Sequence, residues 1–220
     1  GTIIESTSTY IMGQVIDTEV DSFSSGTSNS GMNYRLFKPT EDSNTHPLIV
    51  WFHGNGEGGT GNYQNNCSQL LANRGALGFT TNEAQDIFGG AFVLAPQVDD
   101  AWYYNYRDGL IDDATAMIDQ IVAENPSIDP NRIYIAGASA GGYMTWHMAI
   151  NNPQKFAAVV AACAAIDIAP NPDKGGVETT ADQLLSLKDI PIWIIHSVDD
   201  SVVSVDKSSR FVYSLLEPYG

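Results

Sequence analysis

The segment IYIAGASAGGYMTWHMA, residues 133–149, passes from an apolar strand-like run through small residues into a helical pattern, with Ser139 at the change. Gly137, Ser139 and Gly141 fit the pattern G-x-S-x-G, and a strand before it and a helix after it are the context that this pattern requires. The tight turn lifts the serine hydroxyl above the sheet, and the N–H of Ala140 then faces the place where a negative oxygen would form. The pattern predicts that Ser139 is a nucleophile and that Ala140 is an oxyanion donor. A turn built from small residues only for close packing is the alternative.

A second glycine-rich stretch, WFHGNGEGG at residues 51–59, follows the end of another apolar run. Glycines allow the backbone to approach a ligand closely, and we predict that Asn55 supplies a second oxyanion N–H. We interpret His53 as a structural residue that fastens this loop, and Glu57 as a candidate lining residue of a substrate pocket. A phosphate-binding loop is the alternative, but the G-K-[ST] sequence of such loops is missing here.

A third stretch, IPIWIIHSVDDSVVSVDKS at residues 190–208, is an apolar strand followed by two acidic residues. A carboxylate just past a strand can orient a histidine and stabilise its charged form. We predict that Asp200 has this role and that Asp199 lies in solvent or caps the turn. A solvated acidic turn without a catalytic role is the alternative.

The order of Ser139 and Asp200 is that of the Ser…Asp…His arrangement, so the histidine should follow Asp200. The rest of the chain contains none. We expect His147 to be packed within the helix after the nucleophile, His46 to lie at the opposite edge of the sheet, and His196 to brace the acidic loop. The proton-accepting histidine is therefore expected beyond Gly220.

Aromatic residues follow another predicted strand end, in the segment DDAWYYNY at residues 99–106. Trp102, Tyr103 and Tyr104 are candidates for the wall of an acyl or aromatic pocket. Packing that anchors a loop explains the same residues equally well, and the sequence leaves the two interpretations open.

Composition excludes several classes of partner. The 220 residues are 43% hydrophobic, enough for a sizeable core, and carry a net charge of −16, which opposes binding to nucleic acid and to anionic membranes. No segment approaches the roughly 20 apolar residues of a membrane span, and GTIIESTSTY lacks the basic and apolar regions of a signal peptide. The chain is still compatible with a mature exported protein or a piece of a longer one. The acidic surface, rich in Ser, Thr and Asn, favours a secreted or cell-surface location.

The two cysteines, Cys67 and Cys163, do not make a disulfide framework, and no spacing of Cys and His residues resembles a zinc site. Cys163 lies in an apolar run and is expected to be a buried thiol. No metal and no cofactor is expected.

Predicted strands alternate with predicted helices along most of the chain, which favours an α/β fold with a mainly parallel sheet flanked by helices. We expect an N-terminal strand and loop extension at residues 1–31 and one domain at residues 32–220. The apolar stripe of a 3.6-residue period indicates the first long helix, which Pro126 ends. An edge strand is expected at 10–20, a flexible loop or hairpin connection at 22–31, strands at 32–39, 46–54, 89–96, 132–137, 156–165 and 190–197, and helices at 108–126, 139–151 and 205–216.

Six blocks in this order resemble a branch of bacterial α/β-hydrolase esterases. The blocks are NYRLFKP, PLIVWFHGNGEGG, NRGAL, FVLAPQ, DPNRIYIAGASAGGYMTW and IPIWIIHSVDDSVV. The branch is near the feruloyl-esterase-like and polyhydroxybutyrate-depolymerase-like enzymes, is often labelled "predicted peptidase", and in several members carries an immunoglobulin-like domain before the catalytic one. The resemblance runs from about Asn33 to the end of the chain.

The resemblance implies a serine hydrolase that cleaves carboxylic esters, with Ser139 as nucleophile, Asp200 as acid, and an oxyanion hole at Asn55 and Ala140. Members usually have H-G-x-x-D-x-x-V-P where this chain begins with His196, so the fourth following residue, Asp200, is the acid, and Ser204 replaces the usual proline. The implied substrate is a small-molecule or polysaccharide-linked ester. A serine peptidase of the same fold and a hydrolase-fold module without turnover are the alternatives.

The resemblance also concerns the C-terminal part. The family continues with a further strand, a loop that bears the catalytic histidine, often next to Ser-Trp, and a final helix. This chain stops at EPYG, residues 217–220, so the fold is expected to lack its C-terminal strand and helix.

Overall fold

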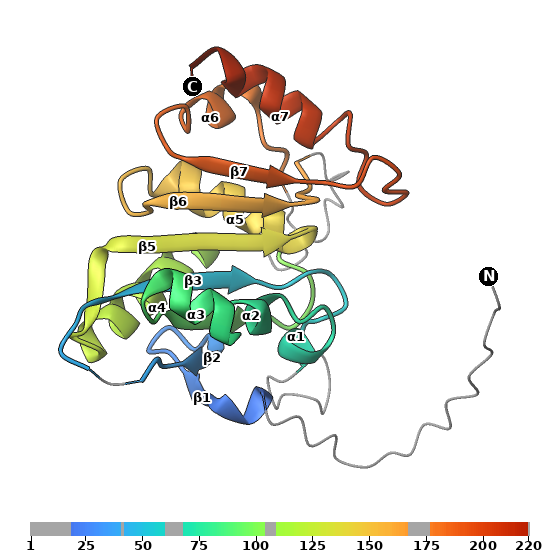
Figure 1. Ribbon diagram of the computed structural model, residues 1–220. Coiled ribbons are helices and arrows are strands. Elements are labelled where there is room, and N and C mark those ends of the chain that lie inside the picture. The colour runs from blue at the N-terminus through green and yellow to red at the C-terminus, as the bar shows by residue number, and fades with distance from the viewer. Residues whose placement is uncertain (1–18, 41, 60–67, 104–108, 167–176, 220) are drawn as a thin grey trace, which may run out of the picture.

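One mainly parallel sheet organises the molecule (Figure 1). The computed structural model describes residues 19–40, 42–59, 68–103, 109–166 and 177–219. In these residues seven strands lie in the order β1-β2-β4-β3-β5-β6-β7, with β1 and β2 antiparallel to their neighbours and the other pairs parallel. The strands are β1 (Phe23–Thr27), β2 (Asn33–Phe37), β3 (His46–Phe52), β4 (Phe92–Gln97), β5 (Ile128–Ala138), β6 (Ala158–Ala162) and β7 (Ile192–Ile195). The predicted α/β class is confirmed.

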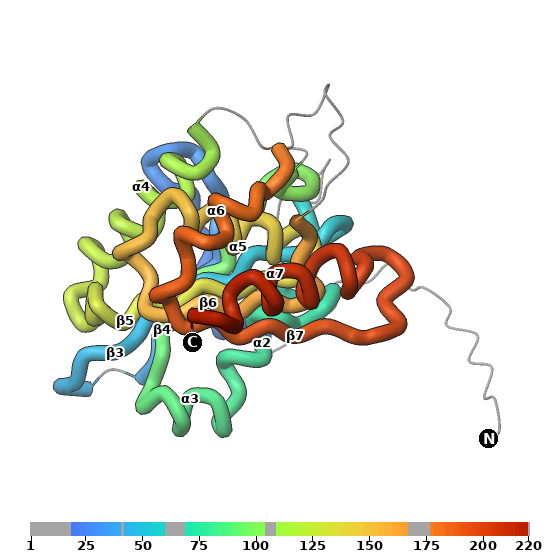
Figure 2. Tube along the Cα trace, turned by 90° about the horizontal axis from the view of Figure 1, so that it is seen from above, coloured from blue at the N-terminus to red at the C-terminus, as the bar shows by residue number. Residues whose placement is uncertain are grey.

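Helices cover both faces of this sheet, as the view from above shows (Figure 2). One face packs against α4 (Leu110–Glu124), α5 (Ala140–Asn151), α6 (Ala181–Leu185) and α7 (Ser209–Leu216). The other face packs against α1 (Ser68–Leu71) and α2 (Gly75–Gly78), with α3 (Asn82–Phe88) on the same side. Short 3-10 turns, η1 (Val20–Ser22) and η2 (Glu217–Tyr219), lie near the two ends of the described chain.

The centre of the sheet is buried on both sides. Every residue of β3 is buried, because helices cover both of its faces, and its sequence is accordingly an apolar run rather than an alternating one. Helix α5 is buried from Ala140 to Ala149, almost all the way round. The element that follows Ser139 is therefore held by packing on every side.

The edge strand β7 is built differently. Its residues alternate between half-buried and exposed, and Trp193 and Ile195 keep 67% and 45% of their surface exposed. The side chains on the opposite face, Ile192 and Ile194, pack against the core cluster that includes α7. Within the described residues, β7 therefore has a covered face and a bare one.

Two details of the sequence prediction need correction. The stretch 22–31 was expected to be a flexible loop or hairpin connection. Phe23–Thr27 instead forms β1, because pairing with β2 overrides the weak strand propensity of Ser and Gly, and only residues 28–31 make the hairpin turn. The last helix begins at Ser209 instead of 205. Most of the predicted edge strand at 10–20 lies outside the described residues, and the division into 1–31 and 32–220 stays a prediction.

No helix of the described residues is both long and apolar enough to cross a membrane. No group of three or more His, Cys, Asp or Glu side chains in the same residues could hold a metal ion.

Candidate active site

The carboxyl ends of the central parallel strands meet at one edge of the sheet. The register pairs Phe52 with Gly137 and Ala138 with Ala162, and Ala162 in turn pairs with Ile195. Backbone bonds continue the ladder one step further, because Ser139 N donates to the Ala162 carbonyl. The three stretches singled out in the sequence thus emerge side by side at this edge.

Ser139 occupies a strained turn between β5 and α5. Its backbone angles, φ 56° and ψ −114°, fall where a residue with a side chain is rarely found. The side chain is half-buried and so reaches the surface. The Ser139 carbonyl accepts from the N–H groups of Tyr143 and Ala165, while Ala140 begins the helix and its N–H belongs to the first turn, where amides lack an intrahelical acceptor. The geometry is that of a serine presented beside a helix N-terminus.

The glycines of this turn have no room for a side chain. A Cβ on Gly137 would lie 2.6 Å from Thr145 Oγ1, and one on Gly141 would overlap the Phe52 carbonyl oxygen and lie 2.6 Å from that of His53. The start of α5 therefore rests directly on the end of β3. The sequence pattern G-x-S-x-G is explained here by steric exclusion.

The glycine-rich loop after β3 lies beside the same turn. A Cβ on Gly54 would lie 3.6 Å from the carbonyl oxygen of Ala138, the residue before Ser139. Asn55 and Gly56 form the exposed tip of the loop. The structure thus brings the predicted donor Asn55 to the edge at which Ser139 lies.

Two residues predicted to line a pocket are instead buried supports of this loop. Glu57 is only 2% exposed, and its carboxylate accepts hydrogen bonds from Gly54 N and from Asn73. Trp102 is 0% exposed, and its Nε1–H donates to the His53 carbonyl at 3.0 Å. Both side chains are buried and hydrogen-bonded inside the protein, so neither has surface left for a substrate. The pocket assignment of Glu57 and Trp102 is wrong.

The other two aromatic candidates have different outcomes. The half-buried Tyr103 packs edge-to-face on Tyr143, with ring centroids 6.2 Å apart. Tyr143 lies one helical turn after Ser139, so Tyr103 stays a candidate wall residue. Tyr104 lies outside the described residues.

His53 is locked into one neutral tautomer. Its Nδ1 lies 2.8 Å from the Gly54 carbonyl, which can only accept, and its Nε2 accepts from Val98 N–H at 3.4 Å. Burial lowers the pKa of His53 to about 4. A histidine whose basic nitrogen is already bonded and inaccessible cannot take the proton of Ser139, which fits the fastening role expected for it.

The remaining histidines also have bonded rings. His46 bonds the Gly89 carbonyl and Asp42 at the amino end of β3, far along the strand from the site edge. His147, within α5, contacts Thr179 Oγ1 at 3.2 Å, and burial lowers its pKa to about 4. None of the four histidines, all of them described, makes a hydrogen bond with Ser139.

His196 and Asp200 form the third part of the site. The imidazole Nδ1 lies 2.7 Å from Ser209 Oγ, and Nε2 lies 3.0 Å from the Val203 carbonyl and 3.3 Å from Asp200 Oδ2. Because the Val203 carbonyl can only accept, Nε2 donates to it. His196 therefore braces the acidic loop, as its sequence position suggested.

The Asp200 carboxylate is stabilised in its ionised form. Its Oδ1 accepts from Val203 N and Val202 N at 2.9 and 2.8 Å, and these bonds, together with nearby His196, hold the pKa of Asp200 below its usual value. Asp199 is exposed, as expected. Asp200 is thus a fixed negative charge at neutral pH.

Cys163 lies between the nucleophile and the acid along this edge of the sheet. The thiol is half-buried, and its pKa is raised by burial and by the charge of Asp200, against the opposing effect of a hydrogen bond with the Ser139 backbone. Cys163 directly follows β6, the strand between β5 and β7, and its N–H donates to the Ile195 carbonyl at 2.7 Å. Sequence reasoning treated Cys163 only as a buried thiol, and its place directly after β6 was the signal that could have put it at the site.

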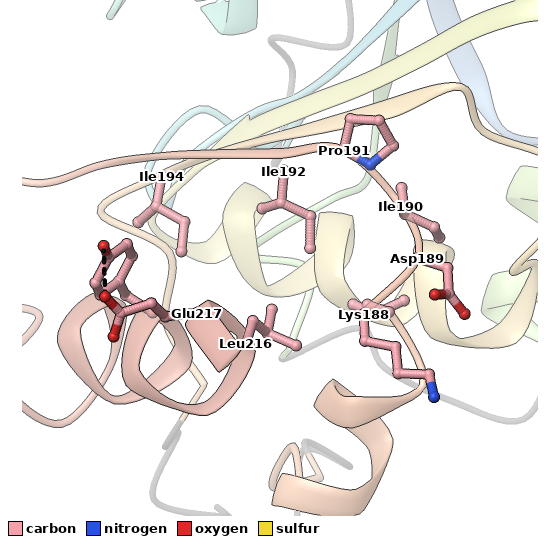
Figure 3. Close-up of a pocket in the computed structure, with 10 residues that line it drawn as sticks. Lys188, Asp189, Ile190, Pro191, Ile192, Ile194, Leu216 and Glu217 are labelled. Carbon is pink, nitrogen blue, oxygen red and sulfur yellow. Dashed lines mark hydrogen bonds between the residues drawn. The ribbon is translucent and has the colours of Figure 1, made fainter. Parts of the chain in front are cut away.

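A cavity of about 300 Å³ lies elsewhere, between β7, the segment 187–191 that precedes it, and the end of α7 (Figure 3). Ile192 and Ile194 project into it from β7 towards Leu216 of α7, and Lys188 and Glu217 stand on its rim. Neither Ser139 nor Asp200 lines it.

Comparison with known proteins gives matches that agree in fold class. Residues 76–171, less than half of the chain, match the prolyl oligopeptidase family. The structure superposes on that of a thermostable esterase with a TM-score of 0.73 and 32% sequence identity, over 92% of this chain and 53% of that one. This chain belongs to the α/β-hydrolase superfamily. These matches together support the fold of the chain.

Two curated relatives of this chain are named as a peptidase and as a depolymerase. An uncharacterized peptidase of Bacillus subtilis, YuxL, is 30% identical over 132 residues, which are 59% of this chain and 19% of the relative. The poly(3-hydroxybutyrate) depolymerase of Ralstonia pickettii is 24% identical over 151 residues, 63% of this chain and 29% of the relative. The chain thus spans less than a third of either relative.

Proposed function

We propose that this chain carries the nucleophile, the acid and the oxyanion donors of a serine hydrolase that cleaves carboxylic esters. The observation that carries the proposal is the strained, surface-reaching Ser139 beside a helix N-terminus and the loop at Asn55. Strain of this kind costs roughly 1–3 kcal/mol and persists where function requires the geometry.

The proposed reaction has two stages. Ser139 Oγ attacks the ester carbonyl while a histidine takes its proton, and the N–H groups of Asn55 and Ala140 stabilise the resulting oxyanion. The C–O bond then breaks, the alcohol leaves with the proton from the histidine, and an acyl group remains on Ser139. Water attacks the acyl-enzyme in the same way, which releases the carboxylic acid and restores Ser139.

The proposal assigns the histidine to residues outside 1–220. All four histidines of the chain have bonded ring nitrogens, and none of them bonds Ser139. Asp200 would orient the incoming imidazole with its ionised carboxylate, which lies past Cys163 from Ser139. The protein as encoded by its gene is therefore the material for any activity assay.

Ester hydrolysis is preferred because the thermostable esterase combines 32% identity with alignment over 92% of this chain. A serine peptidase is the second candidate. The match to the prolyl oligopeptidase family and the 30% identity with YuxL favour it. Both reactions use the same acyl-enzyme chemistry, so substrate alone separates them.

The test begins with a fluorophosphonate probe, which reacts with activated serines. Labelling should require Ser139 and should be lost in Ser139→Ala, while Ser197→Ala, at an exposed serine near the acid loop, should keep it. Labelling that survives Ser139→Ala overturns the proposal. Asp200→Asn should lower kcat by about 10³–10⁴-fold. A panel of acyl esters, feruloyl esters and peptide amides then decides between the candidates, because turnover of peptide amides alone would reject the esterase.

A further inference from the structure

Hydrogen bonds hold the loop after β3 on both sides of its exposed tip. The His53 carbonyl accepts from Trp102 Nε1 at 3.0 Å, and the Gly54 carbonyl accepts from His53 Nδ1–H at 2.8 Å. On the far side, the Glu57 carbonyl accepts from Gln97 Nε2 at 2.9 Å. Asn55 and Gly56 remain as the exposed segment between these anchors.

Because the peptide unit is planar, the fixed Gly54 carbonyl also determines the direction of the Asn55 N–H. The Gly54 carbonyl and the Asn55 N–H belong to the same trans peptide unit, so they point in opposite directions. Because the carbonyl is held by the His53 ring, the N–H points away from that ring. The orientation of the predicted donor therefore depends on how firmly Gly54 is held.

Glu57 holds the other side of Gly54. Its Oε2 accepts from Gly54 N at 2.5 Å, and its Oε1 accepts from Asn73 N at 3.0 Å and Asn73 Nδ2 at 2.5 Å. Burial raises the pKa of Glu57, and the three N–H donors oppose that effect. A carboxylate is the side chain that can accept on both sides at once, whereas an amide would turn its NH₂ group towards one of these donors.

We infer that Glu57 is a positioning residue, whose buried carboxylate ties Gly54 to Asn73 and so aims the Asn55 N–H at the oxyanion. This inference rests on the proposed function. It gives a reason why an acidic side chain is buried next to a site that must stabilise negative charge, because its carboxylate accepts hydrogen bonds from Gly54 and Asn73.

The decisive variant is Glu57→Gln in the protein as encoded by its gene. Misalignment of one oxyanion donor should lower kcat roughly 10–100-fold with KM within about twofold, since the donor acts mainly in the transition state. Affinity for a trifluoromethyl ketone, which forms a tetrahedral oxyanion adduct, should fall in parallel. Glu83→Gln, at an exposed position on α3, is the matched control and should change neither quantity.

A second substitution separates positioning from general damage. In Glu57→Gln with Asn73→Asp, the glutamine Oε1 can accept from Gly54 and its NH₂ can donate to the new carboxylate, although the backbone N–H of residue 73 still faces that NH₂, so kcat should recover in part, at least about twofold. A merely structural role predicts that this double variant is worse than either single one. If Glu57→Gln does not fold, Asn73→Ala is measured instead, and kcat should fall roughly 3–10-fold with unchanged KM.

The outcomes are distinguishable. An unchanged kcat in Glu57→Gln, or in Asn73→Ala where that variant replaces it, overturns the inference if Ser139→Ala is inactive, and leaves the proposed function standing. Equal losses in kcat and in folded fraction, without recovery in the double variant, also overturn it. Retained turnover in Ser139→Ala overturns both proposals together.

Discussion

The nucleophile and the acid lie at the same edge of the sheet but on very different supports. Ser139 follows β5, which has strands on both sides and helices over both faces, and its turn rests directly on β3. Asp200 follows β7, where Trp193 and Ile195 are exposed and, within the described residues, only β6 pairs with the strand. The centre fixes the reacting groups by steric exclusion, whereas the edge holds the acid through local hydrogen bonds around His196.

The largest expected effect is at the centre and concerns packing. Gly141→Ala places a methyl group on the backbone of Phe52 and His53, and should lower the free energy of unfolding by about 3 kcal/mol or more. The matched control is Gly78→Ala, where no atom lies within 4 Å of the new methyl group, and stability should rise by about 0.5–1 kcal/mol. Urea unfolding followed by circular dichroism measures both. A much smaller loss of stability in Gly141→Ala would show that the backbone between α5 and β3 can shift to admit the methyl group.

The next effect concerns the pH dependence of the free energy of unfolding. The buried histidines near the centre and Asp200 at the edge should lose their contributions in different pH ranges. The unfolded state binds protons at His53 and His147 below their ordinary pKa of 6.5, while the native state does so only near pH 4. Stability should therefore fall as pH drops from 6.5 to 4, by up to roughly 3 kcal/mol for each histidine. Asp200 has a lowered pKa, so its contribution should be lost only as pH falls below its ordinary 3.8.

Urea titrations at several pH values test this order. His147→Phe should remove its share of the loss between pH 6.5 and 4, whereas Thr179→Val, which removes only the partner of the ring, should keep the slope. A flat stability profile in that range would mean that the buried histidines are not neutral in the native state.

A smaller effect concerns the strain at Ser139. Glycine adopts the observed backbone angles without penalty, so Ser139→Gly should be inactive and more stable than the native protein by about 1 kcal/mol. Ser139→Ala, which keeps a Cβ, is the control and should leave stability within about 0.5 kcal/mol. Equal stability of the two variants would show that the backbone at residue 139 is not strained.

The smallest effect is expected at the edge. Trp193 is 67% exposed, so Trp193→Ser should change the free energy of unfolding of the 220-residue chain by less than about 0.5 kcal/mol, while binding of a hydrophobic dye should drop. Ile87→Ser, at an exposed residue of α3, should leave dye binding unchanged. A loss of stability above 2 kcal/mol would mean that the face is covered, and the contrast between centre and edge would fail.

The sequence predicted the features that local physics dictates. The apolar runs of β3 and β4, the amphipathic stripe of α4 and the small residues around Ser139 each have a single structural reason, and the structure contains all of them. The short helices α1, α2, α3 and α6 were not anticipated, because helices of four to seven residues carry too few turns for a periodic signal.

The failures at the candidate site have a common cause. Glu57 and Trp102 lie in the loops that follow β3 and β4, where polar and aromatic residues suggest a substrate pocket. Their burial depends on partners distant in sequence, Asn73 for the carboxylate and β3 for the indole, and no local pattern encodes such contacts.

The thiol between the nucleophile and the acid offers a practical route to the substrate. Disulfide-tethered fragment screening captures weak ligands by thiol exchange, and Cys163 is half-exposed next to Ser139 without being needed for turnover in the proposed reaction. Its raised pKa calls for exchange at mildly alkaline pH, with Cys67→Ser to suppress background. Fragments enriched in this way would outline the acyl and alcohol groups that the site accepts, even in a preparation that lacks the general base.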